Sequence, residues 1–178
     1  MLGYLGGASW SILVAKVCQI SGEAGQRGSI ANLVYWFFHT FANWNWPEPV
    51  FIKKVISQPV SAWNPQLNYT DREHAMPIIT SSVPQMNSAV NVSRKTCQLI
   101  KAKLGTGLDT IQSILEGSKS WSCMVQPVTI FQEYEDFILV CGTAKGDSCL
   151  WFGTIESKLR KLLESIQSYS TNVSSVRI

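Results

Sequence analysis

The sequence lacks the residue patterns that most catalytic sites require. Its 178 residues include four aspartates and two histidines, and no two aspartates are spaced as D-x-D. Two-metal phosphoryl transfer needs paired carboxylates that hold ions about 4 Å apart. Neither a G-x-S-x-G elbow nor a P-loop occurs, which removes the common nucleophile and phosphate-cradle motifs. We therefore predict no catalytic residue and no metal site in this chain.

Long apolar runs and paired cysteines are missing as well. No stretch approaches the roughly 18 apolar residues that cross a bilayer, so we predict no membrane partner. The apolar N-terminus from Leu2 to Ala15 lacks a basic flank, which argues against a signal peptide. The five cysteines are odd in number and contain no C-x-x-C pair. This pattern favours reduced thiols in an intracellular protein over a disulfide framework or a zinc site.

What the sequence does contain is apolar surface and an uneven distribution of positive charge. Hydrophobic residues make up 46% and seven tryptophans are present, enough for a core and for a docking surface. Net charge is only +3, but the stretch from Ala75 to Leu108 has no acidic residue. Its basic residues are Arg94, Lys95, Lys101 and Lys103, and a weaker set follows at Lys158, Arg160 and Lys161. The stretch forms either a positive strip for RNA phosphates or an ordinary solvated helix face.

Helical periodicity dominates the N-terminal third of the chain. A first helix enters at Gly6-Gly7 and carries its apolar spacing at Ile12, Leu13, Val17 and Ile20. Ser29 is expected to cap a second helix with an apolar stripe that reaches Phe41.

Residues 47–90 hold six of the seven prolines and predict an extended connection, with a short strand at Val50–Val55. Within it, Asp71, Arg72 and His74 form a D-R-x-H string whose members can orient one another by charge-assisted hydrogen bonds. A structural clasp and a catalytic base at His74 are both open interpretations.

The second half predicts helices and strands together, an α+β fold. A long helix capped by Asn91 or Ser93 is expected to reach Leu115, with an apolar stripe at Cys97, Ile100, Leu104, Leu108, Ile111 and Leu115. Gly105 and Gly107 inside this helix predict a kink or a close contact. A short helix at Ser120–Val125 is followed by a strand at Phe137–Thr143, an amphipathic helix from Ile155 to Ile166 and a strand at Val173–Ile178.

Several strings together resemble the eukaryotic nuclear poly(A) polymerases. They are Gly3-Tyr4-Leu5-Gly6-Gly7 with Ser9-Trp10; Phe37-Phe38 with Trp44-Asn45-Trp46-Pro47; Trp63-Asn64-Pro65; Asp71-Arg72 with His74 and Met76-Pro77-Ile78-Ile79-Thr80; Asn91-Val92-Ser93; and Glu156-Ser157-Lys158 with Arg160. The resemblance runs from residue 2 to about residue 165. It implies that residues 1–80 are the later part of a helical central domain. Residues 81–178 would then be a truncated RRM-like RNA-binding domain, a partial α/β sandwich.

The resemblance also implies a function and a set of contacts. The family adds AMP from ATP to the 3′ ends of pre-mRNA in the nucleus, with Mg²⁺ or Mn²⁺, in company with 3′-end processing factors. The catalytic aspartates and the metal would belong to a nucleotidyltransferase domain outside this chain, so the chain by itself would bind no cofactor. The helix at Gly6, Gly7 and Ile12 would face the nucleotide and primer cleft, although core packing explains it equally well. The basic residues named above would lie near the RNA 3′ end.

Departures from the family pattern support a rival hypothesis. The family often carries a basic residue where Trp36 stands and a lysine where Gly105 stands. Val83 and Ser81 also differ from the usual aromatic and proline. The main hypothesis is the RNA-binding portion of a poly(A) polymerase. The alternative is a non-catalytic, degenerate paralogue or truncated product that acts as a protein-interaction module.

Overall fold

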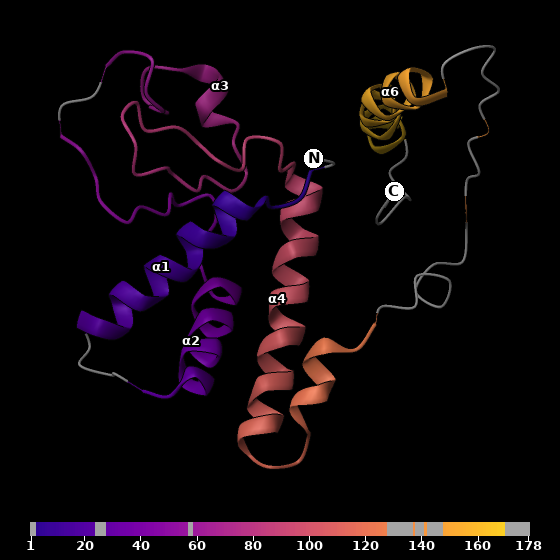
Figure 1. The fold of residues 1–178 in the computed structure, drawn as a ribbon. Coiled ribbons are helices and arrows are strands. Elements are labelled where there is room, and N and C mark those ends of the chain that lie inside the picture. Colours follow the sequence, from indigo (N-terminus) through magenta and orange to yellow (C-terminus); the bar gives the residue numbers. More distant parts are fainter. Residues whose placement is uncertain are drawn as a thin grey trace. The chain divides into compact units, whose positions relative to one another are not determined.

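The computed structural model describes residues 3–23, 28–56, 59–127, 137, 141 and 148–169. They belong to two compact units, one from Gly3 to Val125 and one from Gln126 onward. The first unit contains α1 (Gly7–Glu23), α2 (Ile30–Ala42), α3 (Tyr69–Arg72), α4 (Arg94–Leu115) and the 3-10 helix η1 (Trp121–Val125) (Figure 1). The second unit contributes α6 (Ser148–Tyr169).

The first two helices follow from their apolar spacing. α1 buries Ile12, Leu13 and Val17 on one face, as predicted. α2 begins after Ser29, whose hydroxyl accepts the Asn32 N–H at 3.5 Å, so the predicted cap is present although its hydrogen bond is long. α2 then packs against both α1 and α4 and joins them into one layer of helices.

Ser93 caps α4 and Asn91 does not. The Ser93 hydroxyl accepts the Thr96 N–H at 3.2 Å, and the Thr96 hydroxyl accepts the Ser93 N–H at 2.8 Å. This reciprocal pair satisfies two backbone donors that the start of a helix leaves free. The buried stripe of α4 consists of Thr96, Cys97, Ile100, Leu104, Ile111 and Ile114. Leu115, predicted to belong to it, ends the helix and is 47% exposed.

The two glycines of α4 have different surroundings. A Cβ placed on Gly107 would overlap the ring of Phe38 from α2, whereas a Cβ on Gly105 would meet nothing within 4 Å. The predicted close contact therefore exists at Gly107, where the absence of a side chain lets α2 and α4 approach. α4 remains helical through both positions.

The described residues of the extended connection contain no strand, so the predicted strand at Val50–Val55 is wrong. Two isolated bridges occur instead, Val50 with Ile78 and Ile79 with Asn87. The backbone beyond Val50 is held by the buried side chain of Gln85. Its amide nitrogen donates to the Lys53 carbonyl at 2.8 Å, and its carbonyl accepts the Val55 N–H at 3.1 Å. A side chain thus supplies the partners that a neighbouring strand would otherwise provide.

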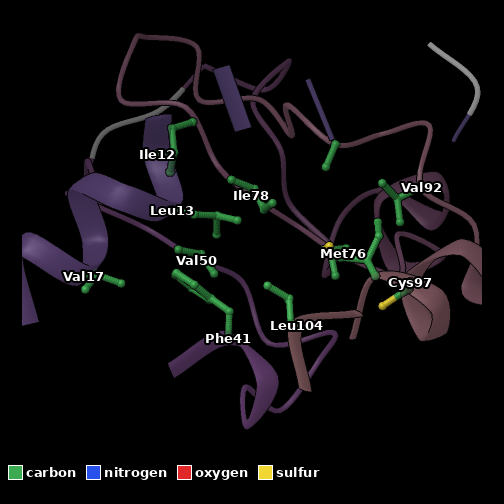
Figure 2. Packing of buried hydrophobic residues seen from close by; sticks show 12 residues of the cluster. Ile12, Leu13, Val17, Phe41, Val50, Met76, Ile78, Val92, Cys97 and Leu104 are labelled. Carbon is green, nitrogen blue, oxygen red and sulfur yellow. The ribbon is translucent and has the colours of Figure 1, made fainter. Parts of the chain in front are cut away.

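One core joins these elements. Side chains from α1, α2, the extended connection and α4 converge in Figure 2, among them Leu13, Phe41, Ile78 and Leu104. The first unit therefore continues through residue 80, where we expected a domain boundary, and ends at Val125. The physical reason is that α4 buries its apolar stripe against α2 and the connection, and so shares one core with them.

In the described residues of the second unit, α6 is the one regular element. Its extent confirms the predicted amphipathic helix, which begins earlier than expected, at Ser148. The described residues of the chain are helical or irregular and contain no strand beyond the two bridges, so they correct the predicted α+β class toward a mainly helical one. The strands predicted at Phe137–Thr143 and Val173–Ile178 lie outside the described residues, apart from Phe137 and Cys141.

Candidate nucleic-acid interface

Two of the four predicted basic residues of α4 lie on one line along the helix. Successive helical residues are rotated by about 100°, so Arg94 and Lys101 differ by roughly 20°. Both side chains are exposed, that of Arg94 by 80%. A rise of about 1.5 Å per residue separates their Cα atoms by roughly 10 Å. We call this pair the α4 basic line.

Lys95 and Lys103 do not extend this line. Lys95 is half-buried and is rotated by about 100° from Arg94. Lys103 is exposed but lies roughly 160° from Lys101 around the helix. Neither lysine is without an interaction partner. The sequence pattern suggested a single positive strip, and helical geometry divides its members between different faces.

Arg94 has an acidic partner that sequence reasoning missed. Its Nη2 atom donates to Oε2 of Glu73 at 3.2 Å, in an ion pair whose two side chains are 80% and 50% exposed. Glu73 is the unnamed residue of the D-R-x-H string and stands in D-x-E spacing with Asp71. The prediction that the chain lacks paired carboxylates overlooked this spacing, and nothing in the spacing indicates a partner on the long helix.

The D-R-x-H string folds into a structural clasp. Oδ2 of Asp71 accepts the Asn64 N–H at 2.8 Å and the Asn68 side-chain amide at 3.0 Å. Nδ1 of His74 accepts the indole N–H of Trp63 at 3.1 Å, which places the proton of the neutral ring on Nε2. The same nitrogen lies 3.8 Å from Oδ1 of Asp71. The polar groups of Asp71 and His74 thus bond to residues near the start of the segment from residue 63 to residue 74 and hold its two ends together.

Cys97 ties the next residues of this loop to α4. Its Sγ donates to the Ala75 carbonyl at 3.6 Å, one turn before Lys101. Burial raises the pKa of the Cys97 thiol, and the positive charge of Lys101 opposes that rise. Because burial is the larger cause, the neutral thiol is favoured, and Cys97 acts as a packing residue beside the basic line.

The residues expected at a nucleotide or primer cleft begin α1. The Gly6 carbonyl accepts the Trp10 N–H at 3.1 Å, and Gly7 is exposed with open space around its Cα. Ile12 is only 9% exposed and belongs to the core. Gly7 therefore reaches the surface, as do the side chains of Trp10 and Val14, whereas Gly6 is half-buried and Ile12 packs in the core.

The second basic set lies on α6 in the other unit. Lys158 is exposed, and the side chain of Arg160 lies outside the described residues. The RNA contact predicted for Lys158 and Arg160 stays a prediction.

Trp36, where the resemblance leads us to expect a basic residue, joins an aromatic cluster on α2. Its ring centroid lies 5.5 Å from Tyr35 and 5.4 Å from His39, and the rings of Tyr35 and His39 are 5.6 Å apart. All three side chains are half-buried. The position that would carry a charge thus carries apolar, partly exposed surface.

The described residues form neither a metal-ligand cluster nor a membrane span. Among these residues, no three His, Cys, Asp or Glu side chains gather where a metal ion would bind. None of the described helices is both long enough and apolar enough to cross a membrane.

The first unit is thus a helical domain with a short basic line on its longest helix. Residues 1–127 match the family model of the poly(A) polymerase central domain. The chain is 36% identical to poly(A) polymerase PAPalpha of Candida albicans, over 94% of its own length. It is 34% identical to nuclear poly(A) polymerase 1 of Arabidopsis thaliana and to poly(A) polymerase of Dictyostelium discoideum, again over 94% of its length.

The chain spans 30%, 23% and 20%, respectively, of the length of these relatives. The chain belongs to the poly(A) polymerase family.

Proposed function

We propose that this chain is an RNA-contacting part of a poly(A) polymerase, an enzyme that adds AMP from ATP to the 3′ ends of pre-mRNA. The α4 basic line contacts backbone phosphates near the RNA 3′ end. The start of α1, with half-buried Gly6 before it and Gly7 exposed, faces the cleft where nucleotide and primer meet. Family membership supports the activity, and the α4 basic line is the observation that carries the RNA contact.

The α4 basic line suits phosphates for an electrostatic reason. Two exposed cations roughly 10 Å apart along a helix can each contact a phosphate of one extended strand. Each such contact releases condensed counterions from the RNA, so affinity falls as salt rises. Acidic residues are absent from Ala75 to Leu108, so only groups brought in from elsewhere in the chain oppose this attraction.

The parent protein would supply the chemistry. We place the Mg²⁺ or Mn²⁺ ion, the ATP and the catalytic aspartates in a nucleotidyltransferase domain of the full-length enzyme. Residues after Gln126, with Lys158 and Arg160 on α6, belong in this proposal to the RRM-like RNA-binding domain. A nuclear location has the support of the Arabidopsis relative, which is named as nuclear, and 3′-end processing factors are the protein partners that this role implies.

Salt-dependent binding of single-stranded RNA tests the proposal. We expect Lys101→Ala to weaken binding at low salt and to make the slope of log affinity against log salt shallower by about 0.7, the contribution of one phosphate contact. Titration of a labelled oligoadenylate at several salt concentrations measures both. Lys53→Ala is the matched control, because it removes an exposed lysine from the extended connection.

Two results would contradict the RNA contact at α4. If both variants change the slope equally, the attraction comes from overall charge. If the folded chain binds no RNA, a protein-interaction module becomes the better hypothesis. The half-buried rings of Tyr35, Trp36 and His39, and the uncharged Gly105 beside the α4 basic line, favour that alternative.

A further inference from the structure

We propose that Glu73 is a competitor of RNA built into the chain: its carboxylate occupies Arg94 when RNA is absent, and an RNA phosphate must displace it. This inference rests on the proposed RNA contact of α4. It assigns a regulatory contact to an acidic residue that is 21 positions away from its basic partner in the sequence.

The backbone around Glu73 is held on both sides. Before it, Nε of Arg72 donates to the Pro65 carbonyl at 3.1 Å. After it, Nδ1 of His74 accepts the Trp63 indole N–H at 3.1 Å. These contacts restrict the backbone at Glu73, so that its side chain extends into solvent from a nearly constant position. The loop therefore presents the carboxylate from a fixed place.

The same loop is fastened to α4. The carbonyl of Ala75 accepts the Cys97 thiol at 3.6 Å, one turn along the helix from Arg94. Two contacts, Glu73 with Arg94 and Ala75 with Cys97, thus run in parallel between the loop and the start of α4. The second contact holds the two backbones close together, so only the exposed side chains of Glu73 and Arg94 have to be ordered for the ion pair to form.

Carboxylate and phosphate compete for the same donors. Both are anions that accept hydrogen bonds from the guanidinium group, and Arg94 offers its Nη2 to Glu73. The exposure of both side chains keeps this pair weak, as ion pairs in water are, so a phosphate can replace the carboxylate. Glu73 therefore lowers RNA affinity without abolishing it.

The competition has a signature in the salt dependence. In the wild type, a phosphate at Arg94 replaces a carboxylate, so that contact exchanges one anion for another. With Glu73→Gln, Arg94 becomes a free cation whose contact with RNA releases counterions. We expect affinity to rise about two- to five-fold at low salt. The salt slope is expected to become steeper by about 0.7.

A double-mutant cycle in the full chain tests this mechanism. Wild type, Glu73→Gln, Arg94→Ala and the double variant are titrated with labelled oligoadenylate over a series of salt concentrations. Glu48→Gln is the control, since it removes one exposed negative charge elsewhere in the first unit. We expect the gain from Glu73→Gln to exceed that from Glu48→Gln and to disappear when Arg94 is alanine.

The outcomes separate this inference from the proposed function. An equal gain with or without Arg94 means that Glu73 repels RNA by its charge alone, which overturns the competition. Binding that is unchanged by Glu73→Gln also overturns it, while a Lys101 effect would leave the RNA contact standing. If no variant binds RNA, the inference and the proposed function both fail.

Discussion

At the scale of single residues, alanine substitutions at Gly105 and Gly107 are expected to affect stability differently, although both glycines lie in α4. We expect Gly105→Ala to stabilise the protein by about 1 kcal/mol, because alanine has the higher helix propensity and the position is open. Gly107→Ala should instead bring no gain and cost up to about 2 kcal/mol, since pushing the Phe38 ring aside costs about 1–3 kcal/mol against a propensity gain of about 1 kcal/mol. Thermal or urea unfolding of both variants measures the difference. Equal stabilisation by the two alanines would show that α2 yields without cost.

Residue-scale sequence reasoning succeeded where the physics is local. Ser29 was identified as a cap and Ser93 was one of two candidates beside Asn91, because a cap needs only its own hydroxyl and an N–H three residues later. The partner of Arg94 could not be predicted from the sequence, because Glu73 comes close to Arg94 only after the chain has folded back on α4. The α4 basic line was half predicted: its residues were named, but Lys95 and Lys103 were assigned to the same surface.

At the scale of elements, the start of α4 depends on a reciprocal cap. Ser93→Ala is expected to destabilise the protein by about 1 kcal/mol, because the Thr96 N–H loses its acceptor. Thr96→Ala removes the other half, the acceptor of the Ser93 N–H. Chemical denaturation of the single and double variants should show non-additive effects, since the two hydroxyls act as a unit.

The exposed Ser122 provides the control for this cap, as Ser122→Ala should change stability by less than about 0.5 kcal/mol. A Ser93 effect no larger than that of Ser122 would mean that packing alone holds the start of α4.

Elements were predictable in proportion to their length and regularity. The helices at α1, α2, α4 and α6 repeat an apolar pattern over many residues, so a single irregularity does not hide them. The apolar residues of Val50–Val55 suggested a strand, but a strand needs a partner. Gln85, thirty-odd positions later and unremarkable in the sequence, takes that place through its side chain. No local pattern announces such a contact.

At the scale of the whole molecule, the core extends across the boundary that the sequence suggested. A chain ending at residue 127 is expected to unfold cooperatively by circular dichroism, because every core residue of the first unit is retained. A chain ending at residue 80 should fail to fold, because it lacks Ala89, Val92, Cys97, Ile100 and Leu104 from the same core. Cooperative folding of the shorter chain would restore the earlier boundary.

The buried thiol of Cys97 makes the opening of the contact between the loop and α4 measurable by chemical modification. A thiol reagent reaches exposed Cys18 directly, but it reaches Cys97 only when the segment around Ala75 lifts from α4. The raised pKa of Cys97 slows its reaction further, since the thiolate is the reactive form. Its rate of modification therefore measures how often the contact between Ala75 and Cys97 opens. RNA bound at Arg94 would change this rate, because Glu73 lies in the same loop as Ala75.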